Sequence, residues 1–325
     1  MRAESRISRA MQLLPQRLVA LALGLFLTAC ATSSDYKPLM TSFSTATATA
    51  QQALEAYDKA AAQRFIQLRR QAAIARPVGV QPPVGDCATG ATRCRILLFA
   101  MPGDPAPAAL SGDSLAPNQV AAMRAVAAYA KALQDLADAD ATPAIKTASE
   151  KAGAAISALA NIAAPGGGAA VTPFAVPLAN AVAWFYGKYQ ERMKLAALQH
   201  ATAEMAPILA SAVSRFATTA QFVSKAELAR LVDTLDMRQA AFDMAPSEAT
   251  LEALLASADN LDQALVTKPQ DVFNNLAAAH DELARALNNP DASWQTAFER
   301  IDRLNSDAEA LGMIASGFLA AANMR

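Results

Sequence analysis

A stripe of apolar and small residues recurs at alternating spacings of three and four from residue 43 onward. Up to residue 72 it comprises Phe43, Thr47, Ala50, Leu54, Tyr57, Ala61, Phe65, Leu68 and Ala72. This spacing puts the residues on one face of a helix, because an α-helix completes a turn about every 3.6 residues. The stripe predicts a long amphipathic helix that opens at Pro38 and ends before Pro77.

Helical spacing continues through most of the remaining chain. It predicts helices over residues 118–138, 143–163, 172–205, 208–223 and 227–244, with Pro207 as a break or a bend, and three more that start at Ser247, Pro269 and Pro290. Alanine is abundant and aromatic residues make up 6% of the chain, which favours helix over strand. The predicted fold is all-α, an elongated bundle of about seven to nine helices.

The first thirty residues have the organisation of a secretory signal. Four arginines, Arg2, Arg6, Arg9 and Arg17, precede "LVALALGLFL" (18–27). An apolar core of about ten residues is too short to span a bilayer. The core ends in Leu27-Thr28-Ala29-Cys30, which resembles the lipobox of bacterial lipoproteins. The resemblance implies removal of residues 1–29, lipidation of the Cys30 thiol and acylation of the new N-terminus with chains such as palmitate.

The same resemblance implies a cellular location and a set of domain boundaries. The protein is expected in the cell envelope, anchored by lipid and facing the periplasm from the outer membrane, because Ala31 rather than an Asp follows Cys30. Residues 30–38 are expected to form the lipidated cysteine and its tether. Residues 39–325 are expected to form the helical domain, with a loop excursion over residues 77–117.

Charge and composition exclude one class of partner. Removal of residues 1–29 takes away four arginines and one glutamate, which leaves a net charge of about −4 and no cluster of basic residues. We therefore expect no nucleic-acid binding. The expected partners are the membrane, through the lipid, and an envelope protein.

The excursion over residues 77–117 is rich in proline and glycine and carries Cys87 and Cys94 in "GDCATGATRC". An oxidising periplasm predicts a disulfide between them that staples the loop. A metal site is disfavoured, because CxxC spacing is missing and the chain has two histidines. "RILLF" (95–99) is the best strand candidate, although a lone short strand is not stable.

The region 152–187 contains no charged residue. Pro165-Gly166-Gly167-Gly168 divides it, and its first arm is too short to cross a bilayer. We interpret it as a buried central hairpin of the bundle. The alternative is a hairpin that inserts into membranes.

Catalytic motifs are missing from the sequence. It has no G-x-S-x-G, H-E-x-x-H or G-x-x-x-x-G-K. His280 lies on the apolar stripe of its helix and is expected to be a core histidine with a hydrogen-bond partner. His200 precedes Glu204 by four residues and is expected to pair with it or to be solvated. We expect no enzymatic activity and no cofactor.

Three functions remain open. The first is a non-enzymatic interaction or structural module of the envelope, for which "YGKYQERMK" (186–194) supplies the candidate contact residues Tyr186, Tyr189 and Arg192. It predicts an exposed apolar patch. The second is a membrane-active helical protein that uses region 152–187. The third is a small-ligand-binding lipoprotein, which predicts a buried polar cluster at His200 or His280 or a large internal cavity.

Overall fold

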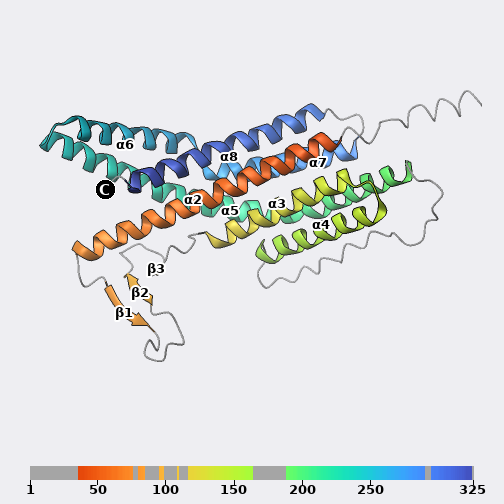
Figure 1. The fold of residues 1–325 in the computed structure, drawn as a ribbon, viewed down its shortest axis with the longest axis horizontal. Coiled ribbons are helices and arrows are strands. Elements are labelled where there is room, and N and C mark those ends of the chain that lie inside the picture. The colour runs from red at the N-terminus through yellow and green to blue at the C-terminus, as the bar shows by residue number, and fades with distance from the viewer. Residues whose placement is uncertain are drawn as a thin grey trace, which may run out of the picture.

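The computed structural model describes residues 36–75, 80–84, 95–98, 108–109, 116–163, 188–289 and 294–323. Within them the chain forms an elongated helical bundle (Figure 1), which confirms the predicted all-α architecture. The seven described helices are α2 (Tyr36–Ala75), α3 (Pro117–Asp138), α4 (Thr142–Ala163), α5 (Lys188–Met244), α6 (Glu248–Val266), α7 (Pro269–Asn288) and α8 (Trp294–Asn323).

Helix α2 lies at the centre of the packing. It contacts α3, α7 and α8, while α5 contacts α3, α4, α6 and α7. Of the described helices, α5 and α8 are the two that make substantial contact with α6. Figure 1 shows that the first residues of α2 lie at one end of the bundle and that the turn between α5 and α6 lies at the other end.

The predicted stripe of α2 faces the core. Its members from Phe43 to Ala61 are all buried, and the buried Thr47 hydroxyl donates to the Phe43 carbonyl oxygen over 2.9 Å. The helix begins at Tyr36, two residues before the predicted opening at Pro38. Its 40 residues make it roughly 60 Å long.

The predicted division of residues 188–244 into separate helices is wrong, because α5 is one helix of 57 residues with Pro207 inside. Proline removes a hydrogen bond to the carbonyl four residues earlier. Here Ala203 and Pro207 are both exposed, so water can solvate the unbonded Ala203 carbonyl. The proline is tolerated because it lies on the solvent face.

The excursion after α2 contains a small sheet. Strands β1 (Val80–Val84), β2 (Arg95–Leu98) and β3 (Ala108–Ala109) form it in the order β1-β2-β3, with both pairings antiparallel. The predicted strand at residue 95 is therefore the middle strand of three, where a loop was expected. The register of β1 shifts between Gln81 and Val84, at two prolines that an edge strand accommodates. Cys87 and Cys94 lie outside the described residues.

The described part of the uncharged region is its first arm. Helix α4 ends at Ala163, and it buries Ala152, Ile156, Leu159 and Ala163 against the core. Residues 164–187, with the predicted turn and second arm, lie outside the described residues, as do the predicted signal peptide, Cys30 and residues 31–35 of the predicted tether. No helix within the described ranges combines the length and apolarity needed to cross a membrane.

A buried carboxylate fixes the point where the chain returns from the sheet to the bundle. Asp58 of α2 is buried, and its Oδ1 accepts a hydrogen bond of 2.8 Å from the backbone N–H of Ala116, the residue before α3. Ala116 has no side chain that could cap the helix itself. Asp58, which is distant in the sequence, therefore supplies the hydrogen-bond acceptor for the Ala116 N–H at the start of α3.

Asp58→Ala should lower the free energy of unfolding by about 1–2 kcal/mol, because it leaves that N–H group without its acceptor. Denaturant unfolding monitored by circular dichroism measures the change. Asp58→Asn retains an acceptor oxygen and should lose less, and Lys59→Ala, at an exposed neighbouring position, should be neutral. Equal losses for the Ala and Asn variants would show that the contact is not the source of the stability.

Candidate interaction surface

The two histidines occupy the environments that the sequence predicts. His280 of α7 is fully buried, and its Nε2 lies 3.1 Å from the hydroxyl of the equally buried Tyr129 on α3. The rings of Phe43 and Tyr129 lie 6.2 Å and 5.8 Å from the His280 ring. Burial lowers the pKa of His280 to about 4. The imidazole is thus neutral at physiological pH and serves as a hydrogen-bonding group in the core.

The second ring nitrogen of His280, Nδ1, is buried and has no hydrogen-bond partner among the described residues. His200 is exposed, and its Nδ1 lies 3.9 Å from Glu204 Oε1 on the same helix. Within the described ranges, no group of three or more His, Cys, Asp or Glu residues is arranged to hold a metal ion.

Two small cavities lie where α2 approaches the start of α7, and both are lined by Tyr57 and Pro269. Their volumes are about 20 Å³ and about 10 Å³. The larger has room for one water molecule, whereas pockets for small-molecule ligands measure about 300–1,000 Å³. Neither cavity can hold a small-molecule ligand.

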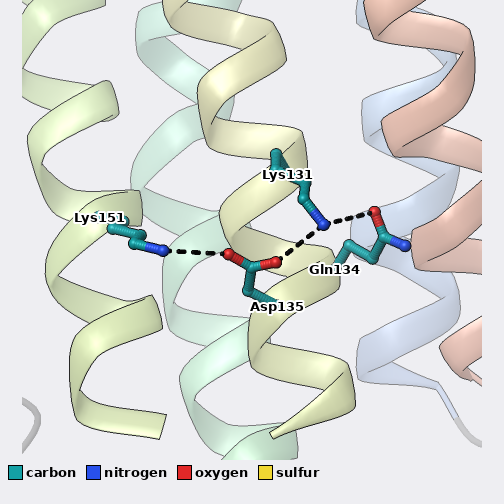
Figure 2. A network of polar contacts seen from close by, with 4 residues as sticks. All are labelled: Lys131, Gln134, Asp135 and Lys151. Atoms are coloured by element: carbon teal, nitrogen blue, oxygen red, sulfur yellow. Dashed lines mark hydrogen bonds and ion pairs between the residues drawn. The ribbon is translucent and has the colours of Figure 1, made fainter. Parts of the chain in front are cut away.

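Charged side chains of the bundle pair across helices. Figure 2 shows Asp135 of α3 between Lys131, four residues earlier, and Lys151 of α4, with Nζ–Oδ distances of 2.9 Å and 3.3 Å. Burial raises the pKa of Asp135, but the hydrogen bonds from the two lysines outweigh this and lower it overall. Asp135 thus forms one ion pair within α3, with Lys131 at i,i+4 spacing, and a second between α3 and α4, with Lys151.

A polar cluster joins the first residue of α2 to the start of α5. Glu191 accepts hydrogen bonds from the Tyr36 hydroxyl at 2.9 Å and from Lys194 Nζ at 2.7 Å. The Lys194 side chain is 4% exposed, and burial together with the Glu191 carboxylate raises the pKa of Tyr36. The cluster fixes the point at which the N-terminal segment enters the bundle.

Of the three predicted contact residues, Tyr189 and Arg192 belong to the start of α5, at this same end of the molecule. Arg192 is exposed and adjoins Glu191 in sequence. Tyr189 lies in the first turn of α5, with its side chain outside the described set, and Tyr186 lies outside the described residues altogether. The structure thus does not bring the three residues together in a described surface.

Exposed apolar side chains gather at the opposite end. Eight large apolar side chains are exposed in the described part of the chain, and seven of them lie within residues 231–266, the α5–α6 hairpin. They are Val232, Met237, Met244, Leu251, Leu255, Leu265 and Val266, while the eighth is Met313 of α8. Scattered exposed leucines are ordinary on proteins, but such a concentration is typical of an interaction site.

The sequence explains why the hairpin folds although it buries little. Ser247 caps α6 as predicted: its Oγ accepts from the Thr250 N–H at 3.2 Å, and its own N–H donates to Thr250 Oγ1 at 2.9 Å. Within α6, Ala264 is the one buried residue. Local capping therefore stabilises a helix whose packing contributes little.

The leucines of α6 differ in their exposure. Leu254 and Leu261 are half-buried, whereas Leu251, Leu255 and Leu265 are exposed. Periodicity identifies leucines that share one side of a helix but does not reveal whether a partner helix covers them. The signal that could have identified this surface is charge, because α6 carries four acidic residues and no basic ones.

Comparison with known proteins gives no relative for this chain: no family model, no curated protein and no solved structure matches it. The hairpin and its surroundings are therefore the basis for assigning a function.

Proposed function

We propose that this chain is a lipoprotein of the bacterial cell envelope that acts as a non-enzymatic interaction module. The lipid on Cys30 anchors it, in the outer membrane and facing the periplasm, and the α5–α6 hairpin is the surface on which an envelope protein docks. The lipobox-like Leu27-Thr28-Ala29-Cys30 supports the anchor. The exposed apolar side chains of the hairpin support the docking surface.

The observation that carries the proposal is the position of these side chains relative to the anchor. Helix α2 begins shortly after Cys30 in the sequence, and the hairpin turn lies at the end of the bundle opposite the start of α2 (Figure 1). Helix α2, which runs between the two ends, is roughly 60 Å long. An anchor at Cys30 would thus leave the hairpin free to meet a partner away from the lipid surface.

The other two functions have less support. A small-ligand carrier needs a cavity, and those beside Tyr57 are too small. A membrane-active protein would depend on the uncharged region 152–187, whereas the exposed apolar surface that the described residues offer is accompanied by acidic side chains, which anionic headgroups repel.

Photo-crosslinking in intact cells tests the proposal. A photo-reactive amino acid at Leu255, which is 55% exposed, should give a discrete adduct of higher mass with another envelope protein. The same amino acid at Ala158, exposed on α4, should give none, because α4 has no comparable apolar surface. The readout is an immunoblot of the membrane fraction after irradiation.

A second arm tests the anchor. Cys30→Ser should abolish labelling by radioactive palmitate and move the protein from the membrane fraction to the soluble fraction. It should also weaken the adduct at Leu255, because the chain is no longer held near its partner. Adducts of equal yield at Leu255 and Ala158, or palmitate labelling that persists in Cys30→Ser, would contradict the proposal.

A further inference from the structure

The exposed side of α6 combines acidic and apolar residues on one face. Leu251, Leu255 and Val266 are 41%, 55% and 82% exposed. Glu252 and Asp259 lie three residues before and four residues after Leu255, and Asp262 lies four before Val266. Residues at these spacings are neighbours on a helix surface. We call these six residues the acidic–apolar face of α6.

Every charged side chain of α6 is acidic. Its acidic residues Glu248, Glu252, Asp259 and Asp262 are exposed, and the helix contains no Lys, Arg or His. None of these four carboxylates has a hydrogen bond or ion pair with another residue in the described part of the chain. The face therefore presents uncompensated negative charge around exposed leucines.

Charge decides between the possible occupants of this face. A second copy of the chain would bring the same four carboxylates against it, and like charges placed together oppose association. An anionic lipid surface is repelled for the same reason. A basic amphipathic helix complements both the apolar and the acidic residues of the face, because its apolar residues cover the leucines while its Lys and Arg side chains pair with the carboxylates.

We infer that the acidic–apolar face of α6 binds a basic amphipathic helix of a partner protein. The inference rests on the proposed function and names the chemistry of the docked partner. The partner helix carries apolar anchors at intervals of three and four residues with lysines or arginines beside them. Salt screens the charge pairs between the basic side chains of the partner and the exposed carboxylates of α6, so binding weakens as ionic strength rises.

A model peptide tests the inference directly. The probe is a fluorescein-labelled peptide of about fourteen residues with leucine and lysine in helical repeat, and its matched control has glutamate at every lysine position. Fluorescence anisotropy is measured against the chain from residue 30 onward, with Cys30→Ser so that no lipid competes. The lysine peptide should bind at least roughly tenfold more tightly than the glutamate peptide, and added salt should weaken the binding.

Variants locate the binding to the face. Leu255→Ala should weaken binding of the lysine peptide roughly tenfold. Glu252→Lys/Asp259→Lys should reverse the preference, so that the glutamate peptide binds more tightly. Asp281→Lys/Asp302→Lys makes the same change in net charge at exposed positions of α7 and α8 and should leave the preference unchanged. Circular dichroism confirms that each variant is folded.

Several results would overturn the inference. They are equal binding of the two peptides, no binding of either, reversal by the Asp281→Lys/Asp302→Lys control, dimerisation that depends on Leu255, and sedimentation with phosphatidylglycerol vesicles that depends on Leu255. If any of these occurs while the Leu255 crosslink in cells persists, the partner chemistry is wrong and the docking function stands. If the crosslink itself is missing, the docking function fails.

Discussion

Leu283→Ala should lower the free energy of unfolding by about 2.5–5 kcal/mol. Leu283 lies on α7 with none of its surface exposed, in the core cluster that also contains Phe43 and Tyr129. Removing its side chain loses the free energy of burial and leaves a cavity that the surrounding helices cannot fill completely. Urea unfolding followed at two wavelengths measures the loss. The comparison holds if the slope of the unfolding free energy against urea concentration is the same in the variant and in the unsubstituted protein.

Leu255→Ala is the matched control, because it makes the same chemical change at a position that is 55% exposed. It should change the free energy of unfolding by no more than about 0.5 kcal/mol. This contrast would show that the leucines on the outer side of α6 serve something other than the fold. A loss at Leu255 as large as that at Leu283 would instead mean that Leu255 is packed in the protein in solution.

Acidification should destabilise the protein through His280. Burial holds its folded-state pKa at about 4, below the value of about 6.5 in an unfolded chain. The unfolded state therefore binds the proton more readily between these values. The stability from this group is complete above pH 6.5 or so and is lost as the pH falls toward about 4, with a decrease of about 2 kcal/mol between about pH 7.5 and 5.

The physical cause lies in the surroundings of the ring. A protonated His280 would carry a charge between Tyr129 and Phe43, and its Nδ1–H would have no acceptor among the described residues. His280→Gln should therefore show a smaller loss of stability over the same pH range. His200→Gln, at the exposed histidine, should behave as the unsubstituted protein does. Identical pH profiles for all three proteins would rule out His280 as the titrating group.

Helical periodicity predicted the bundle because apolar stripes determine which side of each helix is buried. The stripe from Phe43 to Ala61 lies in the core as predicted. His280, between Leu276 and Leu283 on its own stripe, is a core histidine with a hydrogen-bond partner. These predictions succeeded because they needed only the sequence of one helix and the general preference of apolar residues for the interior.

Two features depended on information that lies outside any single helix. Pro207 does not interrupt α5, because Ala203 and Pro207 are both exposed, and solvent exposure depends on the positions of the other helices. The outer leucines of α6 are exposed because no described helix covers them. The sequence shows that these leucines share a face, but the presence or absence of a covering helix is a property of the tertiary structure.

The arrangement of α2 has a mechanical consequence. The chain enters α2 at Tyr36, and the helix then runs lengthwise against α3 and α8 (Figure 1). Tension applied through Tyr36 along the helix axis must slide α2 past its neighbours and disrupt many contacts together, whereas a perpendicular pull could peel them apart in turn. Resistance to such loading is set by the rate of unfolding rather than by equilibrium stability. A protein tethered at this residue would hold its position under forces that act along the bundle.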